Sequence, residues 1–143
     1  MNRIRTGRMI LAGLVTLLVF ILVEIVWESL IGVTLFPRMF NVSREALGLK
    51  EWNLVSFSIN IGVAALNSVM MIWLYAALRP MFGVGPRNAL ITSGFIFAFI
   101  LAFSINNVNM GFIPMFIAGF DILSLVVELP IAIIAGAAFY EAG

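Results

Sequence analysis

The sequence contains no cysteine and no histidine, and only 10% of its residues are charged. Without cysteine the chain has no disulfides, no thiolate nucleophile and no Fe–S ligands, and its redox compartment cannot be inferred. Without histidine it lacks the commonest haem and zinc ligand and the usual proton shuttle near neutral pH. A net charge of +1 gives no electrostatic reason to bind nucleic acid. We therefore expect no nucleic-acid partner, no resident metal and no cofactor.

Apolar residues are abundant instead, at 63% of the 143 residues. A soluble domain of this size cannot hide so much apolar surface from water, so the chain is predicted to be an integral membrane protein in contact with the lipid bilayer. Its length allows one small bundle, so residues 1–143 are predicted to form a single transmembrane domain. No nucleotide loop, zinc motif, nucleophile elbow or intramembrane protease motif is present, which predicts that the protein is not an enzyme.

Four apolar segments are long enough to cross about 30 Å of hydrocarbon. They are Met9–Leu35, Leu54–Leu78, Asn88–Ser104 and Ile113–Tyr140. The prediction is an all-α membrane protein, a four-transmembrane-helix bundle. Pro130 lies inside the last segment and is expected to kink that helix.

The connections between these segments differ in kind. Arg38–Trp52 mixes apolar and charged residues and predicts a short interfacial amphipathic helix between helices 1 and 2, although an irregular loop is the alternative. Prolines and glycines in Arg79–Arg87 predict a tight, non-helical turn. Asparagines and a glycine in Asn106–Gly111 predict a polar turn. Trp27, Trp52, Trp73 and Tyr75 suit interfacial aromatic belts, although Trp27 is expected to lie deep in its span.

Lysine and arginine placement predicts the orientation. If the N-terminus is inside, the inner side carries five basic residues and the outer side three. Because basic residues favour the cytoplasmic side, both termini of this multi-pass protein are predicted to be cytoplasmic.

Four of the seven acidic residues lie within the predicted first and last spans, with no basic residue beside them. They are Glu24, Glu28, Asp121 and Glu128. Ionised carboxylates are costly in hydrocarbon, so such residues usually face a bundle interior or a wet cavity and often have a function. This set is the strongest functional lead in the sequence.

The two pairs match in depth if the first and last helices are antiparallel neighbours. At about 1.5 Å per residue, Glu28 is expected to be level with Asp121, and Glu24 within about a turn of Glu128. Carboxyls held close together favour sharing a proton, and a protonated carboxyl can bridge helices. In a wet cavity the same proton can move, which is the chemistry of a proton or cation path.

Simple helix packing is the competing interpretation of these polar groups. Asn60 and Asn67 on the second span, with neighbouring serines, could satisfy the carboxyls and hold the bundle together. Small residues also recur at four-residue spacing, which favours close helix approach within the chain or at a subunit interface. They are Ser58 and Gly62; Gly94, Ala98 and Ala102; and Ala132 and Gly136.

Two stretches carry a family resemblance. At Trp73–Pro86 (WLYAALRPMFGVGP) and Val127–Glu141 (VELPIAIIAGAAFYE), the chain resembles a group of small uncharacterised four-span bacterial inner-membrane proteins. The resemblance implies a bacterial inner-membrane location, but no catalytic residue, because the group has no established activity. The resemblance makes Glu128 a stronger site candidate, because Glu128 lies in the second stretch.

Our leading functional hypothesis is a non-enzymatic small membrane subunit, an accessory component of a larger complex or a homo-oligomer. The alternative is a small proton- or cation-coupled carrier or conduit that uses the intramembrane carboxylates, with Asn60 and Asn67 nearby. A weaker alternative is a lipid- or pigment-binding membrane protein.

Overall fold

The computed structural model describes residues 5–35 and 53–142, and all regular structure in these residues is helical. Four helices are long and apolar enough to cross a membrane, in agreement with the predicted multi-pass bundle. The first span is continuous over Thr6–Leu35 and comprises α1 (Thr6–Trp27), a π-helical turn (Glu28–Gly32) and α2 (Val33–Leu35). The other spans are α4 (Leu54–Phe82), α5 (Pro86–Asn109) and α6 (Met115–Glu141). The predicted interfacial helix at Arg38–Trp52 lies outside the described residues.

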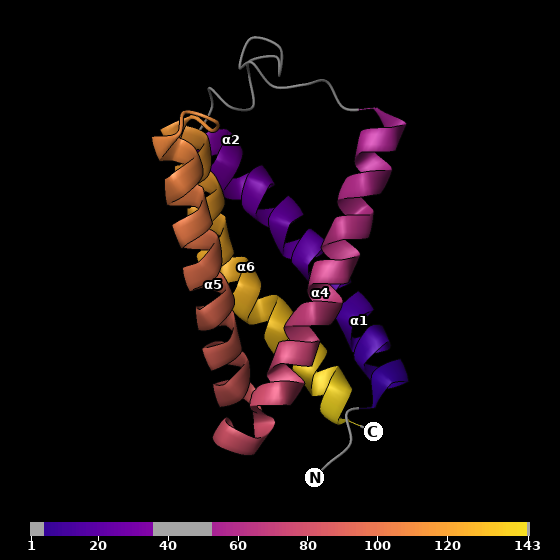
Figure 1. The fold of residues 1–143 in the computed structure, drawn as a ribbon. Helices are drawn as coiled ribbons and strands as arrows, with labels where there is room; N and C mark the ends of the chain where they lie inside the picture. Colours follow the sequence, from indigo (N-terminus) through magenta and orange to yellow (C-terminus); the bar gives the residue numbers. More distant parts are fainter. Residues whose placement is uncertain (1–4, 36–52, 143) are drawn as a thin grey trace.

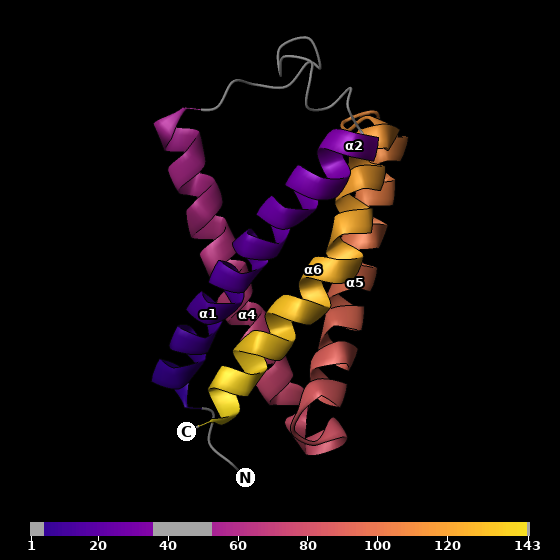
Figure 2. The same cartoon turned by 180° about the vertical axis from the view of Figure 1, so that it is seen from behind.

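The start of α1 and the end of α6 lie at the same end of the bundle, called here the terminal end (Figure 1). The opposite end is called the loop end. Helix α6 packs against both α1 and α5, and α1 also packs against α4. Figure 2 shows α6 bending part-way along its length, as expected for a helix with Pro130 in its interior.

The buried core lies in the terminal half of the bundle. It is built from the start of α1 and α5 and from the end of α4 and α6, with Tyr75, Ile72, Leu129 and Ile133 fully buried. Towards the loop end, α4 diverges from the other helices and its side chains become exposed (Figure 1). The bundle is therefore tightly packed at its terminal end, whereas α4 stands apart from the other helices at the loop end.

Two glycines allow the backbones to approach closely in this core. A Cβ at Gly136 would meet the Thr16 hydroxyl and lie 2.8 Å from Ile72 Cδ1. A Cβ at Gly13 would lie 2.7 Å from the Cα of Val69, so α1 and α4 are in backbone contact there. Gly136, Gly62 and Gly94 all belong to the predicted small-residue pattern. Of the three, Gly136 lies at a close approach, whereas an added Cβ at Gly62 or Gly94 would meet nothing within 4 Å.

The two turns predicted at Arg79–Arg87 and Asn106–Gly111 are shorter in the structure than in the prediction. The interpretation of Arg79–Phe82 as non-helical is wrong, because α4 continues through Pro80 and Gly83 N–H donates to the Arg79 carbonyl at its end. A proline in the last turn removes one backbone donor without stopping the helix. The turn itself is short and uses Gly83 and Gly85, both at positive φ, which glycine adopts without strain.

The asparagine turn is also shorter than predicted, because α5 extends to Asn109. The Asn107 amide donates to the Phe103 carbonyl at 2.8 Å, and the backbone turns only after Met110, at Gly111 with φ 77°. The assignment of Tyr75 to an interfacial belt is wrong as well, because its side chain is fully buried. Trp73 is 48% exposed on the same helix.

Candidate functional site

The register between α1 and α6 follows from two contacts. The Trp27 and Phe120 rings pack with centroids 6.4 Å apart and planes at 47°. Nearer the terminal end, Gly136 lies against Thr16. Because α1 and α6 run antiparallel, the residues that follow the two rings lie on opposite sides of this contact, and Glu28 and Asp121 lie within about one helical turn of each other in depth.

The four carboxyl groups lie on two helices that pack together, Glu24 and Glu28 on the first span and Asp121 and Glu128 on α6. Glu24, Glu28 and Asp121 are near enough to Glu128 for their charges to act on it. Glu24, Glu28 and Asp121 are exposed on the described surface, whereas Glu128 is only 2% exposed. Together with the Trp27–Phe120 pair, these four residues are called the acid–aromatic cluster.

Glu128 is the buried centre of this cluster. Its Oε1 has no hydrogen-bond partner among the described residues. The hydroxyl of Ser124, which donates to the Asp121 carbonyl at 2.9 Å, lies beside the same carboxyl group. An unpartnered carboxyl oxygen in a buried site is energetically unfavourable and commonly marks a place where a ligand, ion or water binds.

The backbone of α1 changes its hydrogen bonding within the cluster. The π-helical turn begins at Glu28, where the Val33 N–H donates to the Glu28 carbonyl in place of the usual i→i−4 partner. Such single turns insert a residue into the helical repeat and redirect the side chains that follow, and they are frequent at functional sites. The turn begins at Glu28, within about one helical turn of Asp121 in depth.

Among the described residues, Asn60 and Asn67 make no hydrogen bond to the acid–aromatic cluster. The Asn60 amide donates to the Ser56 carbonyl at 2.8 Å on the exposed side of α4. Asn67 is exposed and lines a groove of about 430 Å³ between α4 and α5, whose other lining residues are apolar. Within the described part of the chain, neither amide hydrogen-bonds to a carboxylate.

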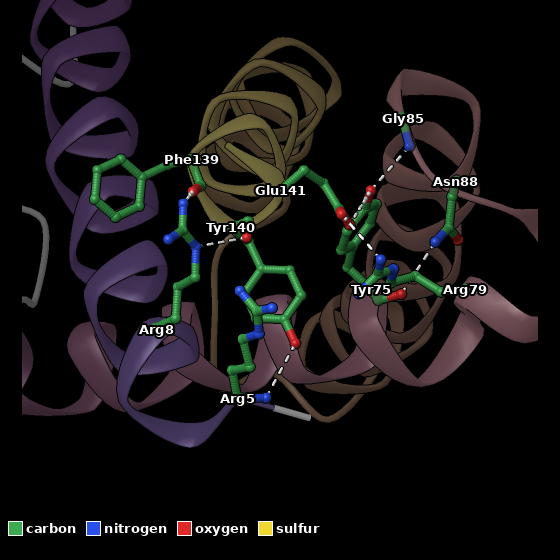
Figure 3. Close-up of polar contacts among 9 residues, drawn as sticks. All are labelled: Arg5, Arg8, Tyr75, Arg79, Gly85, Asn88, Phe139, Tyr140 and Glu141. Atoms are coloured by element: carbon green, nitrogen blue, oxygen red, sulfur yellow. Dashed lines mark hydrogen bonds and ion pairs between the residues drawn. The ribbon is translucent and has the colours of Figure 1, made fainter. Parts of the chain in front are cut away.

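A second polar network lies at the terminal end, and sequence reasoning missed it (Figure 3). The Tyr75 hydroxyl accepts a hydrogen bond from Gly85 N–H at 2.9 Å and donates to Glu141 Oε1 at 3.2 Å. Glu141 also pairs with Arg79 at 3.0 Å, and the Asn88 amide donates to the Tyr75 carbonyl at 3.0 Å. The network therefore joins the end of α4, the start of α5 and the end of α6.

The start of α1 closes the same network. Arg8 donates to the Tyr140 carbonyl at 2.7 Å and to the Phe139 carbonyl at 2.8 Å (Figure 3). These carbonyls belong to the last turn of α6, where a positive charge is favourable. The sequence signal for this network was present in the two stretches of resemblance, because Tyr75 and Arg79 lie in the first and Glu141 in the second.

No protein family, curated protein or solved structure matches this chain. The four-span membrane architecture implied by the resemblance is present, but the family is not identified.

The two polar sites differ in what they can do chemically. The terminal network has nearly matched donors and acceptors, with an ion pair and aromatic contacts, so it serves to hold the helix ends together. The acid–aromatic cluster has an excess of acceptors and negative charge. The described basic residues (Arg5, Arg8, Arg79 and Arg87) all lie at the opposite end of the bundle. The cluster is therefore the better candidate for binding.

Proposed function

We propose that this protein is a non-enzymatic membrane subunit that works by associating with other membrane helices. The partners are further copies of itself or the subunits of a larger complex. One observation carries the proposal: Asn60 and Asn67 are exposed on α4 within a membrane-spanning helix.

An amide in hydrocarbon gains free energy when it hydrogen-bonds to another helix, by about 0.6–2 kcal/mol. Asn60 and Asn67 are seven residues apart and share one face of α4. Beside Asn67, the groove between α4 and α5 offers apolar surface, including Met70 and Phe95, for a docked helix. The geometry thus supports a helix–helix interface on this side of the bundle.

Asn60→Leu and Asn67→Leu, combined in one chain, should weaken this association. The expected loss is about tenfold or more in the association constant, because two interhelical hydrogen bonds are removed. Crosslinking in native membranes, followed by mass determination in mild detergent, measures the assembly. Leu66→Ala, an exposed change on the same helix, is the control and should leave the assembly intact. A wild-type protein that is purely monomeric without a co-purifying partner would contradict the proposal.

A second candidate function, a proton- or cation-coupled carrier or conduit, is favoured by buried Glu128, whose Oε1 has no partner within the part of the chain that the structure describes. In liposomes with a pH-sensitive dye inside, the protein should then carry proton or solute flux. Glu24→Gln and Glu128→Gln should abolish most of it, because neither variant can exchange a proton at that position. Flux that these variants leave unchanged would eliminate this candidate.

We further infer a bacterial inner-membrane location with both termini in the cytoplasm. Support comes from the family resemblance and from the arginines Arg5, Arg8, Arg79 and Arg87, which gather at the terminal end.

A further inference from the structure

The chemistry of the acid–aromatic cluster indicates the type of ligand that it suits. It combines three exposed carboxyl groups with one buried carboxyl group whose Oε1 has no hydrogen-bond partner in residues 5–35 and 53–142. No described lysine or arginine neutralises it, since the described basic residues lie at the terminal end. A ligand that suits these groups brings positive charge and a hydrogen-bond donor.

The spacing of the carboxyl groups argues against a metal ion as that ligand. Metal ions require several oxygen ligands within about 2–2.6 Å. Among the described residues, no three acidic side chains converge closely enough to hold one. The charges are spread along two helices, from Glu24 to Glu28 on the first span and from Asp121 to Glu128 on α6, which suits a larger cation.

The aromatic pair adds a second preference. Trp27 lies between Glu24 and Glu28 in the sequence and packs on Phe120, beside Asp121. Aromatic faces attract organic cations through their ring quadrupole, and they also bind the apolar part of such molecules. The combination of carboxyl groups with an aromatic pair is typical of a site for an amphiphilic organic cation.

We propose that the acid–aromatic cluster binds a small organic cation with N–H donors, an alkylammonium or alkylguanidinium compound, and that Glu128 is its anchor. The N–H group of the ligand donates to Glu128 Oε1, the exposed carboxyl groups supply attraction at the entrance, and its alkyl chain lies against the aromatic pair. The inference gives a ligand class to the site of the second candidate function, but it requires only binding and no transport.

The test uses the full chain in detergent micelles and hexylammonium chloride as the probe. Trp52→Phe and Trp73→Phe leave Trp27 as the only tryptophan, so that its fluorescence reports on the cluster. Hexylammonium should change this fluorescence saturably. Glu128→Gln should weaken binding about tenfold or more, because it removes the charge that faces the ammonium group. Glu141→Gln, a matched change at the other end of α6, should leave the affinity unchanged.

Three further measurements separate this ligand class from others. Hexyltrimethylammonium has the same charge but no N–H donor, so it should bind about tenfold more weakly. Asp121→Asn should weaken hexylammonium binding severalfold, and it provides a second variant if Glu128→Gln does not fold. Absence of saturable binding, equal binding of hexyltrimethylammonium, or a response to MgCl₂ alone would overturn the proposal. The binding measurement applies no gradient across a membrane. A protein that binds the probe but carries no proton or solute flux would therefore contradict the carrier function and leave the binding proposal intact.

Discussion

Replacing Gly13 by alanine should destabilise the bundle by about 1–3 kcal/mol, the usual effect of overpacking a close contact. The added Cβ would lie 2.6 Å from Val69 Cγ2, 2.7 Å from Val69 Cα and 2.9 Å from Val69 N. Two of these atoms belong to the backbone of α4, so no side-chain rotation can relieve the contact. Helices α1 and α4 would have to separate at the point where they cross.

The measurement is an SDS titration in mixed micelles, with helix content followed by circular dichroism. Gly94→Ala is the matched control, because Gly94 lies inside α5 with nothing within 4 Å of its added Cβ. At that position alanine should be neutral or slightly stabilising, since it has the higher helix propensity. Equal midpoints for the two variants would mean that α1 and α4 are not in backbone contact.

The glycines of the chain also show how much of the helix packing could be predicted from the sequence. Four-residue spacing identifies a helix face made of small residues, but it does not identify the neighbour that this face meets. Gly136 lies at a close approach as expected, whereas Gly94 and Gly62 do not. Gly13 was missed, although Ala12 and Thr16 beside it also have four-residue spacing and are both fully buried.

The four spans were predictable because length and hydropathy reflect one dominant constraint, the hydrocarbon thickness. The ends of the spans could not be predicted. Pro80 and Asn107 favour turns, but each lies in the last turns of a long helix that continues through it. The approximate depths of Glu28 and Asp121 follow from the fixed rise per residue of a helix, and the Trp27–Phe120 contact places them within about one turn of each other. The hydrogen-bond partners of the Tyr75 hydroxyl, Gly85 and Glu141, could not be predicted, since they lie 10 and 66 positions away along the chain.

Replacing Tyr75 by alanine should destabilise the protein by about 3–5 kcal/mol, because a fully buried aromatic ring is removed from the core. Tyr75→Phe separates the hydroxyl from the ring. It keeps the packing but leaves Gly85 N–H without its acceptor and Glu141 without one donor. The expected loss for phenylalanine is about 1–3 kcal/mol.

Tyr140→Phe is the matched control for the hydroxyl, because Tyr140 is the other tyrosine of the chain and is also buried. Among the described residues its hydroxyl accepts one long hydrogen bond, 3.4 Å from the Arg5 backbone nitrogen, so its removal should have a much smaller effect. The same SDS titration compares the three variants. If Tyr75→Phe and Tyr140→Phe were equally stable, the Tyr75 hydroxyl would not hold the three helix ends together. Tyr75→Ala would still be destabilised, so its result alone could not establish the network.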